Sequence, residues 1–306
     1  MPSTVGSALA ALDRAPAWLN SDPLSADGLH GRVVLLDIWT YSCVNWLRTL
    51  PYVSAWSERY RDRGFVVVGV HAPEFGFERD LDNVRRATDE LGVSYPVVID
   101  NDFAIWRSLD NHYWPAAYLV DREGRLRFRH FGEGAYEDIE RAIQQLLGVD
   151  EPTADVDAGG LAEAADWDAL RSPETYLGAS RGERRRFGGA EELTLNEWTL
   201  AGDWAVGEEA AVLHAAGGSI AYRFEARDLN LVMGPAVSGA PVRFAVTLDG
   251  APPGDAAGLD VDASGEGTVT ESRMYQLIRR LGGDARRTFQ ITFSDPGVHA
   301  YVLTFG

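Results

Sequence analysis

Residues 33–51, VVLLDIWTYSCVNWLRTLP, decide the fold of the first half of the chain. The run Val33–Trp39 is short, continuous and rich in β-forming residues, which is typical of a strand buried on both faces. A polar turn, Thr40–Ser42, follows this run, and from Val44 onward apolar residues recur with helical spacing. The stretch therefore predicts a buried strand, a tight turn and a helix that has Cys43 at its first turn.

Cys43 is the only cysteine of the chain. At the first turn of a helix, a sulfur lies near unpaired backbone N–H groups and the positive end of the helix dipole. Both features favour the thiolate, which is the nucleophilic form. A fall in the thiol pKa by about two units, from about 8.5, corresponds to roughly 2.7 kcal/mol of preferential stabilisation of the anion. We therefore expect the chemistry of this protein at Cys43.

Three further residues of this stretch resemble the active site of the thioredoxin superfamily. Asp37 lies six residues before the cysteine, where thioredoxins carry a buried carboxylate. Trp39 matches their aromatic residue four positions before the cysteine, and Pro51 matches the proline eight positions beyond it. The alternation of predicted strands and helices agrees with this resemblance. It indicates an α/β thioredoxin-like three-layer sandwich that closes with a hairpin and a helix.

Longer motifs narrow the resemblance. The segments WTYSCVN (39–45), GVHAPEF (69–75) and YWPA (113–116) resemble the soluble C-terminal region of DipZ-type thiol–disulfide proteins. In those proteins a redoxin (AhpC/TSA-like) domain is followed by a β-rich module, and the resemblance covers about residues 15–306. It implies that Pro115 is cis and lies beside Cys43. The loop after the second strand, residues 71–75, is expected at the same edge, because such loops line the ligand crevice of α/β sheets.

One departure from the family bears on the function. The motif Cys-x-x-Cys reads Cys43-Val44-Asn45-Trp46 here, and no second thiol exists to attack a mixed disulfide from within the chain. We therefore predict monothiol redox activity with an antioxidant role. In it, Cys43 is oxidised by a peroxide or joined in a mixed disulfide and is then resolved by an external thiol. The alternative is a catalytically degenerate thioredoxin-fold protein that binds a client in the same groove while Trp46 blocks turnover.

The other candidate residues surround Cys43 in this arrangement. Asp37, His71 and Glu74 are the candidates for handling protons. Each also has a structural interpretation, because Asp37 could solvate the turn or bond Trp46, and the other two could fix their loop. The residues expected to contact a bound thiol, peroxide or peptide are Trp39, Thr40, Asn45, Trp46, Trp114 and Pro115.

Two other kinds of site receive less support. Thr40 and Cys43 have the Thr-x-x-Cys spacing of peroxiredoxins, but the proline that those proteins carry four residues before the threonine is Leu36 here. Arg48 could hold a thiolate or peroxide by charge-assisted hydrogen bonds, although we expect it on a solvated helix face. A metal site with Cys43 and His71 is disfavoured, because closed sites show several ligands at short spacing. No cofactor is predicted.

The chain is expected to contain two folded parts. We predict a flexible leader (1–15), a redoxin domain (16–148), an acidic linker (149–171) and an all-β jelly-roll or β-sandwich domain (172–306). The last part has short alternating strands about every ten residues, and the matching module of DipZ-like proteins resembles carbohydrate-binding domains. Glycan binding needs exposed planar aromatics, whereas buried ones belong to the core. The candidates are Trp198, Trp204, Tyr222 and Tyr275.

Composition limits the partners. The net charge is −18 and the pI is near 4.7, which argues against nucleic acid and anionic membranes as ligands. The sequence contains no lysine, so lysine Schiff-base chemistry and a P-loop lysine are excluded. Because residues 1–19 lack a signal-peptide pattern and no apolar run reaches about 18 residues, we expect a cytoplasmic protein. Its expected partners are a small thiol or peroxide and, at the β-domain, a client protein or glycan.

Overall fold

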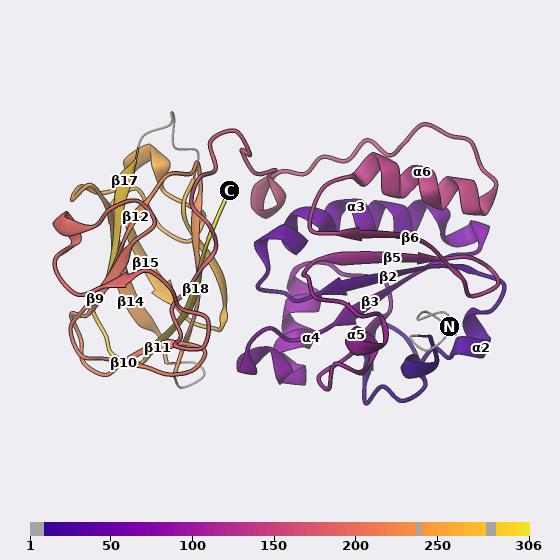
Figure 1. Ribbon diagram of the computed structural model, residues 1–306, viewed down its shortest axis with the longest axis horizontal. Helices are drawn as coiled ribbons and strands as arrows, with labels where there is room; N and C mark the ends of the chain where they lie inside the picture. The colour runs from indigo at the N-terminus through magenta and orange to yellow at the C-terminus, as the bar shows by residue number, and fades with distance from the viewer. Residues whose placement is uncertain (1–8, 237–239, 280–285) are drawn as a thin grey trace. The chain divides into compact units, whose positions relative to one another are not determined.

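The computed structural model describes residues 9–236, 240–279 and 286–306. These residues form two compact units, one that ends at Glu163 and one that begins at Ala164 (Figure 1). The first unit is an α/β sandwich and the second consists mainly of β-strands, so the predicted fold class is confirmed. Among the described residues, no helix is both long and apolar enough to cross a bilayer.

A single six-stranded sheet forms the middle layer of the first unit. The three strands β2, β3 and β4 are parallel, and each of the other three pairs antiparallel with its neighbour. In spatial order the strands are β1 (Trp18–Leu19), β4 (Val97–Ile99), β3 (Phe65–His71), β2 (Val33–Trp39), β5 (Ala116–Val120) and β6 (Leu126–Phe131). The predicted hairpin is the β5–β6 pair.

Helices cover both faces of this sheet, which completes the three layers. Figure 1 shows α3 and α6 on one side of the sheet and α2 and α5 on the other. The α-helices are α2 (Ala26–Leu29), α3 (Val44–Tyr60), α4 (Leu81–Glu90), α5 (Ala104–Ser108) and α6 (Tyr136–Leu147). Short 3-10 turns are η1 (Arg61–Arg63), η2 (Gly76–Arg79) and η3 (Gly160–Ala162).

The central strand β2 is buried along its whole length. Because side chains alternate across a strand, Val34, Leu36 and Ile38 point to one face, where they pack in a core with residues of α2 and α5. Asp37 and Trp39 point to the opposite face, toward α3, where the indole of Trp46 contacts both of them. The strand therefore packs against apolar residues on both faces, and its single charged residue, Asp37, lies on the α3 side.

The ends of the first unit differ from the expected leader and linker. Residues 1–8 lie outside the described residues, but residues 9–12 are helical, and Leu9 and Leu12 are buried in the core because both side chains are apolar. In the expected linker, the N–H of Ala154 donates to Glu140, and Arg59 donates to the carbonyl of Pro152. These parts of residues 1–15 and 149–171 are therefore packed against the α/β sandwich.

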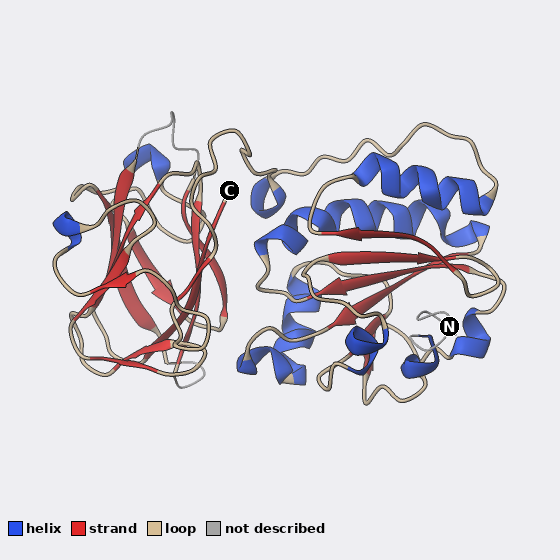
Figure 2. Ribbon diagram, in the orientation of Figure 1, coloured by secondary structure: helices blue, strands red, loops and turns tan. Residues whose placement is uncertain are grey.

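Two six-stranded sheets make up the second unit, in which strands predominate (Figure 2). One sheet contains β7 (Thr175–Tyr176), β10 (Trp204–Val206), β11 (Ala211–Leu213), β13 (Leu229–Pro235), β16 (Arg273–Ile278) and β18 (Val298–Phe305). The other contains β8 (Arg185–Arg186), β9 (Trp198–Ala201), β12 (Ser219–Phe224), β14 (Val242–Leu248), β15 (Glu266–Val269) and β17 (Arg287–Phe293). The 3-10 turns η4 (Ala190–Glu192) and η5 (Gly254–Ala256) lie between strands. The sequence pattern did not indicate β7, β8, β10 or β16.

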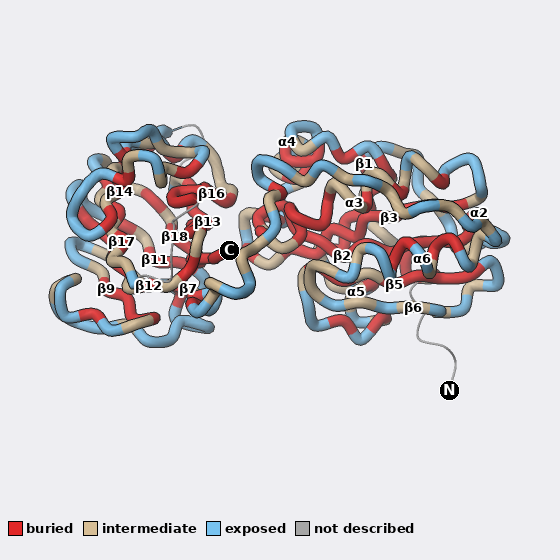
Figure 3. Tube along the Cα trace, turned by 90° about the horizontal axis from the view of Figure 1, so that it is seen from above, coloured by how far each residue is buried: buried red, intermediate tan, exposed pale blue. Residues whose placement is uncertain are grey.

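The space between these two sheets is an apolar core, seen as buried segments of the strands in Figure 3. Trp198, Tyr222 and Tyr275 belong to this core, and Trp204 packs against it. Three of the four aromatic residues considered for glycan binding are therefore core residues, and Trp204 is partly exposed beside them.

We predict that Gly69→Ala destabilises the first unit. A Cβ at position 69 of β3 would lie 2.9 Å from Trp39 Nε1 and 2.9 Å from Tyr95 Cε2, so one of these buried rings must move. Overpacking of this kind costs about 1–3 kcal/mol, to be measured by urea unfolding. In the control Gly159→Ala the nearest atom lies at 3.7 Å, and the expected change is within about 0.5 kcal/mol. Equal effects of the two substitutions would contradict this account of the core.

Candidate active site

Cys43 is the N-cap residue of α3, as the sequence indicated. Its backbone is extended, with φ −79° and ψ 113°, and its carbonyl accepts the first helical hydrogen bond from Leu47 N at 3.0 Å. The residue is partly exposed. In the run 40–50, Cys43 and Asn45 are partly exposed and all the other residues are buried. The positive end of α3 therefore carries two partly exposed residues, Cys43 and Asn45.

Trp46, three residues after Cys43, faces inward. Its side chain is fully buried, and its indole stacks on Trp39 with ring centroids 4.2 Å apart. The indole Nε1 donates a hydrogen bond to Asp37 Oδ2 at 3.1 Å. The side chain three residues after Cys43 is therefore part of the core.

Asp37 is buried and bonded to two donors. Its Oδ2 accepts hydrogen bonds from Trp46 Nε1 and from Tyr95 Oη at 3.2 Å. Burial raises the pKa of Asp37 from 3.8 to about 6, and the two hydrogen bonds limit the rise because they favour the carboxylate. The structure thus gives Asp37 the indole of Trp46 as a partner, one of the two structural interpretations considered for it.

His71 lies at the end of β3, paired in register with Trp39. Its ring is fully buried, packs edge-on to Trp39 at 4.9 Å and stacks on Tyr41 at 5.9 Å. Burial lowers the pKa of His71 to about 3, so the imidazole is neutral near pH 7. Neither ring nitrogen has a hydrogen-bond partner among the described residues. His71 therefore lies beside the site as a buried neutral imidazole.

The loop that follows β3 contains a functional candidate that the sequence did not indicate. Glu78, in η2, is fully buried, and its Oε1 accepts a 2.5 Å hydrogen bond from the hydroxyl of Ser42, the neighbour of Cys43. Its Oε2 accepts hydrogen bonds from the backbone N–H groups of Glu74 and Phe75. Burial, with Glu74 as the second cause, raises the pKa of Glu78 to about 7. The sequence signal is a glutamate three residues after Phe75, the spacing of a helix-capping carboxylate.

A second loop comes from the β5 side of the sheet. The Trp114–Pro115 peptide bond is cis, as the resemblance implied. Trp114 Nε1 donates to the carbonyl of Ala72 at 2.9 Å, and Gly132 N donates to the carbonyl of Pro115 at 2.9 Å. The hydrogen bond to Ala72 joins two of the segments that carry the family resemblance, 113–116 and 69–75.

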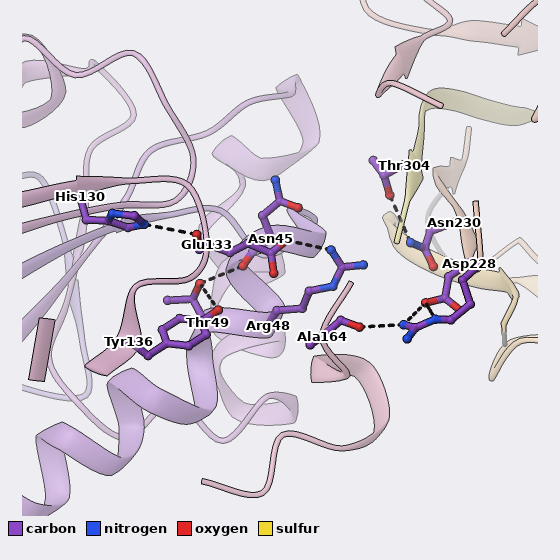
Figure 4. A network of polar contacts seen from close by, with 11 residues as sticks. Asn45, Arg48, Thr49, His130, Glu133, Tyr136, Ala164, Asp228, Asn230 and Thr304 are labelled. Carbon is purple, nitrogen blue, oxygen red and sulfur yellow. Dashed lines mark hydrogen bonds and ion pairs between the residues drawn. The ribbon is translucent and has the colours of Figure 1, made fainter. Parts of the chain in front are cut away.

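Arg48 corrects one expectation. Only 4% of its side chain is exposed, and its Nη1 lies 2.8 Å from Glu133 Oε1, so it is a buried ion-pair member and does not lie on a solvated helix face (Figure 4). An arginine can be buried where a buried carboxylate compensates its charge and its apolar stem packs against other residues. The next residue, Thr49, donates a hydrogen bond from its hydroxyl to the carbonyl of Asn45 (Figure 4).

Thr40 is buried beside Glu78, and its hydroxyl lowers the pKa of Glu78. Among the described residues, no cluster of His, Cys, Asp and Glu could hold a metal ion.

Comparison with known proteins agrees with this geometry. Residues 11–146 match the family model described as Redoxin, and residues 172–306 match the thioredoxin like C-terminal domain. The first unit is a redoxin domain, and the second is a thioredoxin-like C-terminal domain. Protein DipZ of Mycobacterium tuberculosis is 36% identical over 233 residues, which are 71% of this chain and 34% of DipZ. The chain thus spans about one third of the length of DipZ.

The redoxin domain has further relatives. The thiol-disulfide oxidoreductase YkuV of Bacillus subtilis is 27% identical over 44% of this chain and 90% of its own length. The solution structure of a thioredoxin-like protein in the oxidized form is 27% identical, covers 44% of this chain and 91% of that chain, and has a TM-score of 0.41. Each of these two similarities covers less than half of this chain.

We predict that Asp37 makes folding stability fall as the pH rises through the window between its two pKa values. The pKa is 3.8 when the group is unperturbed and about 6 in the folded domain. Because the folded state binds the proton more tightly, the contribution of Asp37 is fully present below pH 3.8 and lost as the pH rises through 6. The loss is about 3 kcal/mol.

Asp37→Asn removes this titration but keeps an oxygen that can accept from Trp46 and Tyr95. The unfolding free energy of the variant minus that of the wild type should therefore increase by about 3 kcal/mol between about pH 4 and about pH 7. Denaturant unfolding at several pH values measures the difference. A difference that does not vary with pH would show that Asp37 is not protonated in the folded domain near pH 5.

Proposed function

We propose that this protein carries out monothiol–disulfide exchange at Cys43. The observation that supports the proposal is the arrangement of residues 40–50, in which Cys43 is partly exposed at the helix start and Trp46 is fully buried. Because Cys43 is partly exposed, we expect an external disulfide to reach it. The same arrangement leaves no internal thiol to complete the exchange.

The exchange proceeds in two balanced steps. First, the Cys43 thiolate attacks one sulfur of an external disulfide, the Cys43–sulfur bond forms, the external S–S bond breaks, and one thiolate leaves. Second, an external low-molecular-weight thiolate attacks the mixed disulfide and releases Cys43 as thiolate. The net result is the exchange of one external disulfide for another, with no change in the oxidation state of the protein.

The chain contributes position and electrostatics to these steps. Backbone N–H groups at the start of α3 and the helix dipole stabilise the thiolate, both before attack and as leaving group. Asn45 is the partly exposed neighbour that a bound partner would meet, and the cis Trp114–Pro115 loop forms the acceptor face that the family resemblance implies. The stacked rings of Trp39 and Trp46 support the turn that precedes α3.

Disulfide exchange takes precedence over peroxide reduction in this proposal. A peroxidatic cysteine is helped by an arginine that binds the peroxide and the thiolate. The Nη1 of Arg48 is engaged with Glu133 and the side chain is buried, so its charge is already compensated. Oxidation of Cys43 to a sulfenic acid by a hydroperoxide, with loss of an alcohol, is the slower branch that we expect.

The proposal predicts that glutathione disulfide forms one adduct per chain and that reduced glutathione removes it. Intact-protein mass spectrometry measures both steps, and the labelling is unambiguous because Cys43 is the only thiol. The variant Cys43→Ser should form no adduct. A native wild-type protein that forms no adduct would contradict the exchange proposal and favour the non-catalytic binding protein.

Trp46→Cys is the matched test of the second position. A thiol at position 46 restores the Cys-x-x-Cys spacing, so the adduct should not accumulate and an internal disulfide should replace it. The substitution also removes a buried indole and is expected to cost about 3–5 kcal/mol of stability. A thermal melt establishes that the variant is folded before the assay. Persistence of the adduct in a folded variant would show that position 46 cannot reach Cys43.

A further inference from the structure

The exchange steps leave one buried group beside the site without a role. Glu78 is fully buried, and a hydrogen bond joins its carboxyl to Ser42, the residue that precedes Cys43. A buried carboxyl is costly unless its oxygens are bonded. Both oxygens of Glu78 have partners, so its position is determined by specific contacts.

These contacts join two segments that are far apart in sequence. Oε1 bonds the side chain of Ser42, in the turn between β2 and α3. Oε2 accepts from the N–H groups of Glu74 and Phe75, in the loop after β3, at 2.5 and 3.0 Å. The turn that presents the thiol is therefore tied to the adjacent loop through a single carboxyl group.

We propose that Glu78 is a positioning residue of the thiol site, which acts through Ser42 to hold the turn before Cys43 and whose negative charge, when present, opposes formation of the thiolate. This inference rests on the proposed exchange at Cys43. It adds a regulation of that site, because the reactivity of the thiol then depends on the protonation of a second group in the same domain.

The surroundings of Glu78 support a titration near neutral pH. Burial and the negative charge of Glu74 raise its pKa to about 7, while the hydroxyls of Ser42 and Thr40 and the N–H of Phe75 oppose the rise. Glu74 is the charged group whose field reaches it, and His71 on the neighbouring strand is neutral. Glu78 is protonated below about pH 7 and ionised above it.

The sign of the coupling follows from like charges. Above about pH 7, an ionised Glu78 and a Cys43 thiolate repel each other, so each raises the pKa of the other. Two coupled groups titrate in two macroscopic steps. The reactivity of the wild-type thiol should therefore rise with pH in two stages, with the second displaced to higher pH.

The test is the rate of Cys43 alkylation by iodoacetamide, measured from about pH 5 to about pH 9 on the full chain. Glu78→Gln removes the charge and keeps a polar group against Ser42 and the two N–H groups. It should give a single-step profile, with alkylation about threefold or more faster than the wild type at pH 8.

Glu140→Gln is the matched control. Glu140 is also a buried glutamate bonded to side chains of α3, namely Trp56 and Tyr60. Trp56 lies thirteen residues beyond Cys43, or about 20 Å along the helix. This variant should keep the two-step profile of the wild type, whatever its stability.

A second variant keeps the proposal testable if Glu78→Gln does not fold. Ser42→Ala removes a hydrogen bond that favours the ionised form of Glu78, so the first step should move to higher pH. Identical wild-type and variant profiles for Glu78→Gln, or for Ser42→Ala where only it folds, would overturn the role of Glu78. A wild-type thiol that is alkylated but forms no glutathione adduct would instead count against the proposed function, and the role of Glu78 would still be decided by the profiles.

Discussion

The hydrogen bond between the Trp46 indole and the Asp37 carboxyl is the interaction on which the site depends. It lies beneath the start of α3, and stacking on Trp39 completes it. Together these contacts hold the side chain of Trp46 in the core. Cys43 lies at the helix start as a partly exposed residue, while Trp46 is buried. Packing thus accommodates the bulk of Trp46 beneath the helix start, beside the partly exposed Cys43.

Two buried acidic residues, Asp37 and Glu78, contact the segment around Cys43. The carboxyl group of Asp37 accepts hydrogen bonds from an indole and a phenol, and that of Glu78 accepts them from a hydroxyl and two backbone N–H groups. Burial raises the pKa of both groups, which lowers folding stability near neutral pH compared with groups left in water. Groups with such perturbed pKa values gather at functional sites more often than elsewhere. Only Glu78 is bonded to the residue next to the thiol, so we assign it the coupling to Cys43.

Much of the first domain was predictable because its signals are local. The apolar run of β2, the helical spacing after Cys43 and the turn of the β5–β6 hairpin each depend on neighbouring residues. The burial of Glu78 and of Arg48 was not predictable. Their partners lie 36 and 85 residues away, and only the folded chain brings them together. The strand β16 was missed because Gln276 interrupts its apolar residues, so its sequence shows neither a continuous apolar run nor a strict alternation.

The reaction of Cys43 with Ellman's reagent, a small aromatic disulfide, tests the central claim most directly. Its rate constant in the native protein is compared with that in the same protein unfolded in urea at the same pH. The account predicts a native rate at least equal to the unfolded rate, because the thiol is accessible and its anion is stabilised by the helix start. A native rate that is slower by orders of magnitude would contradict it, because the sulfur would then be covered or held as a thiol.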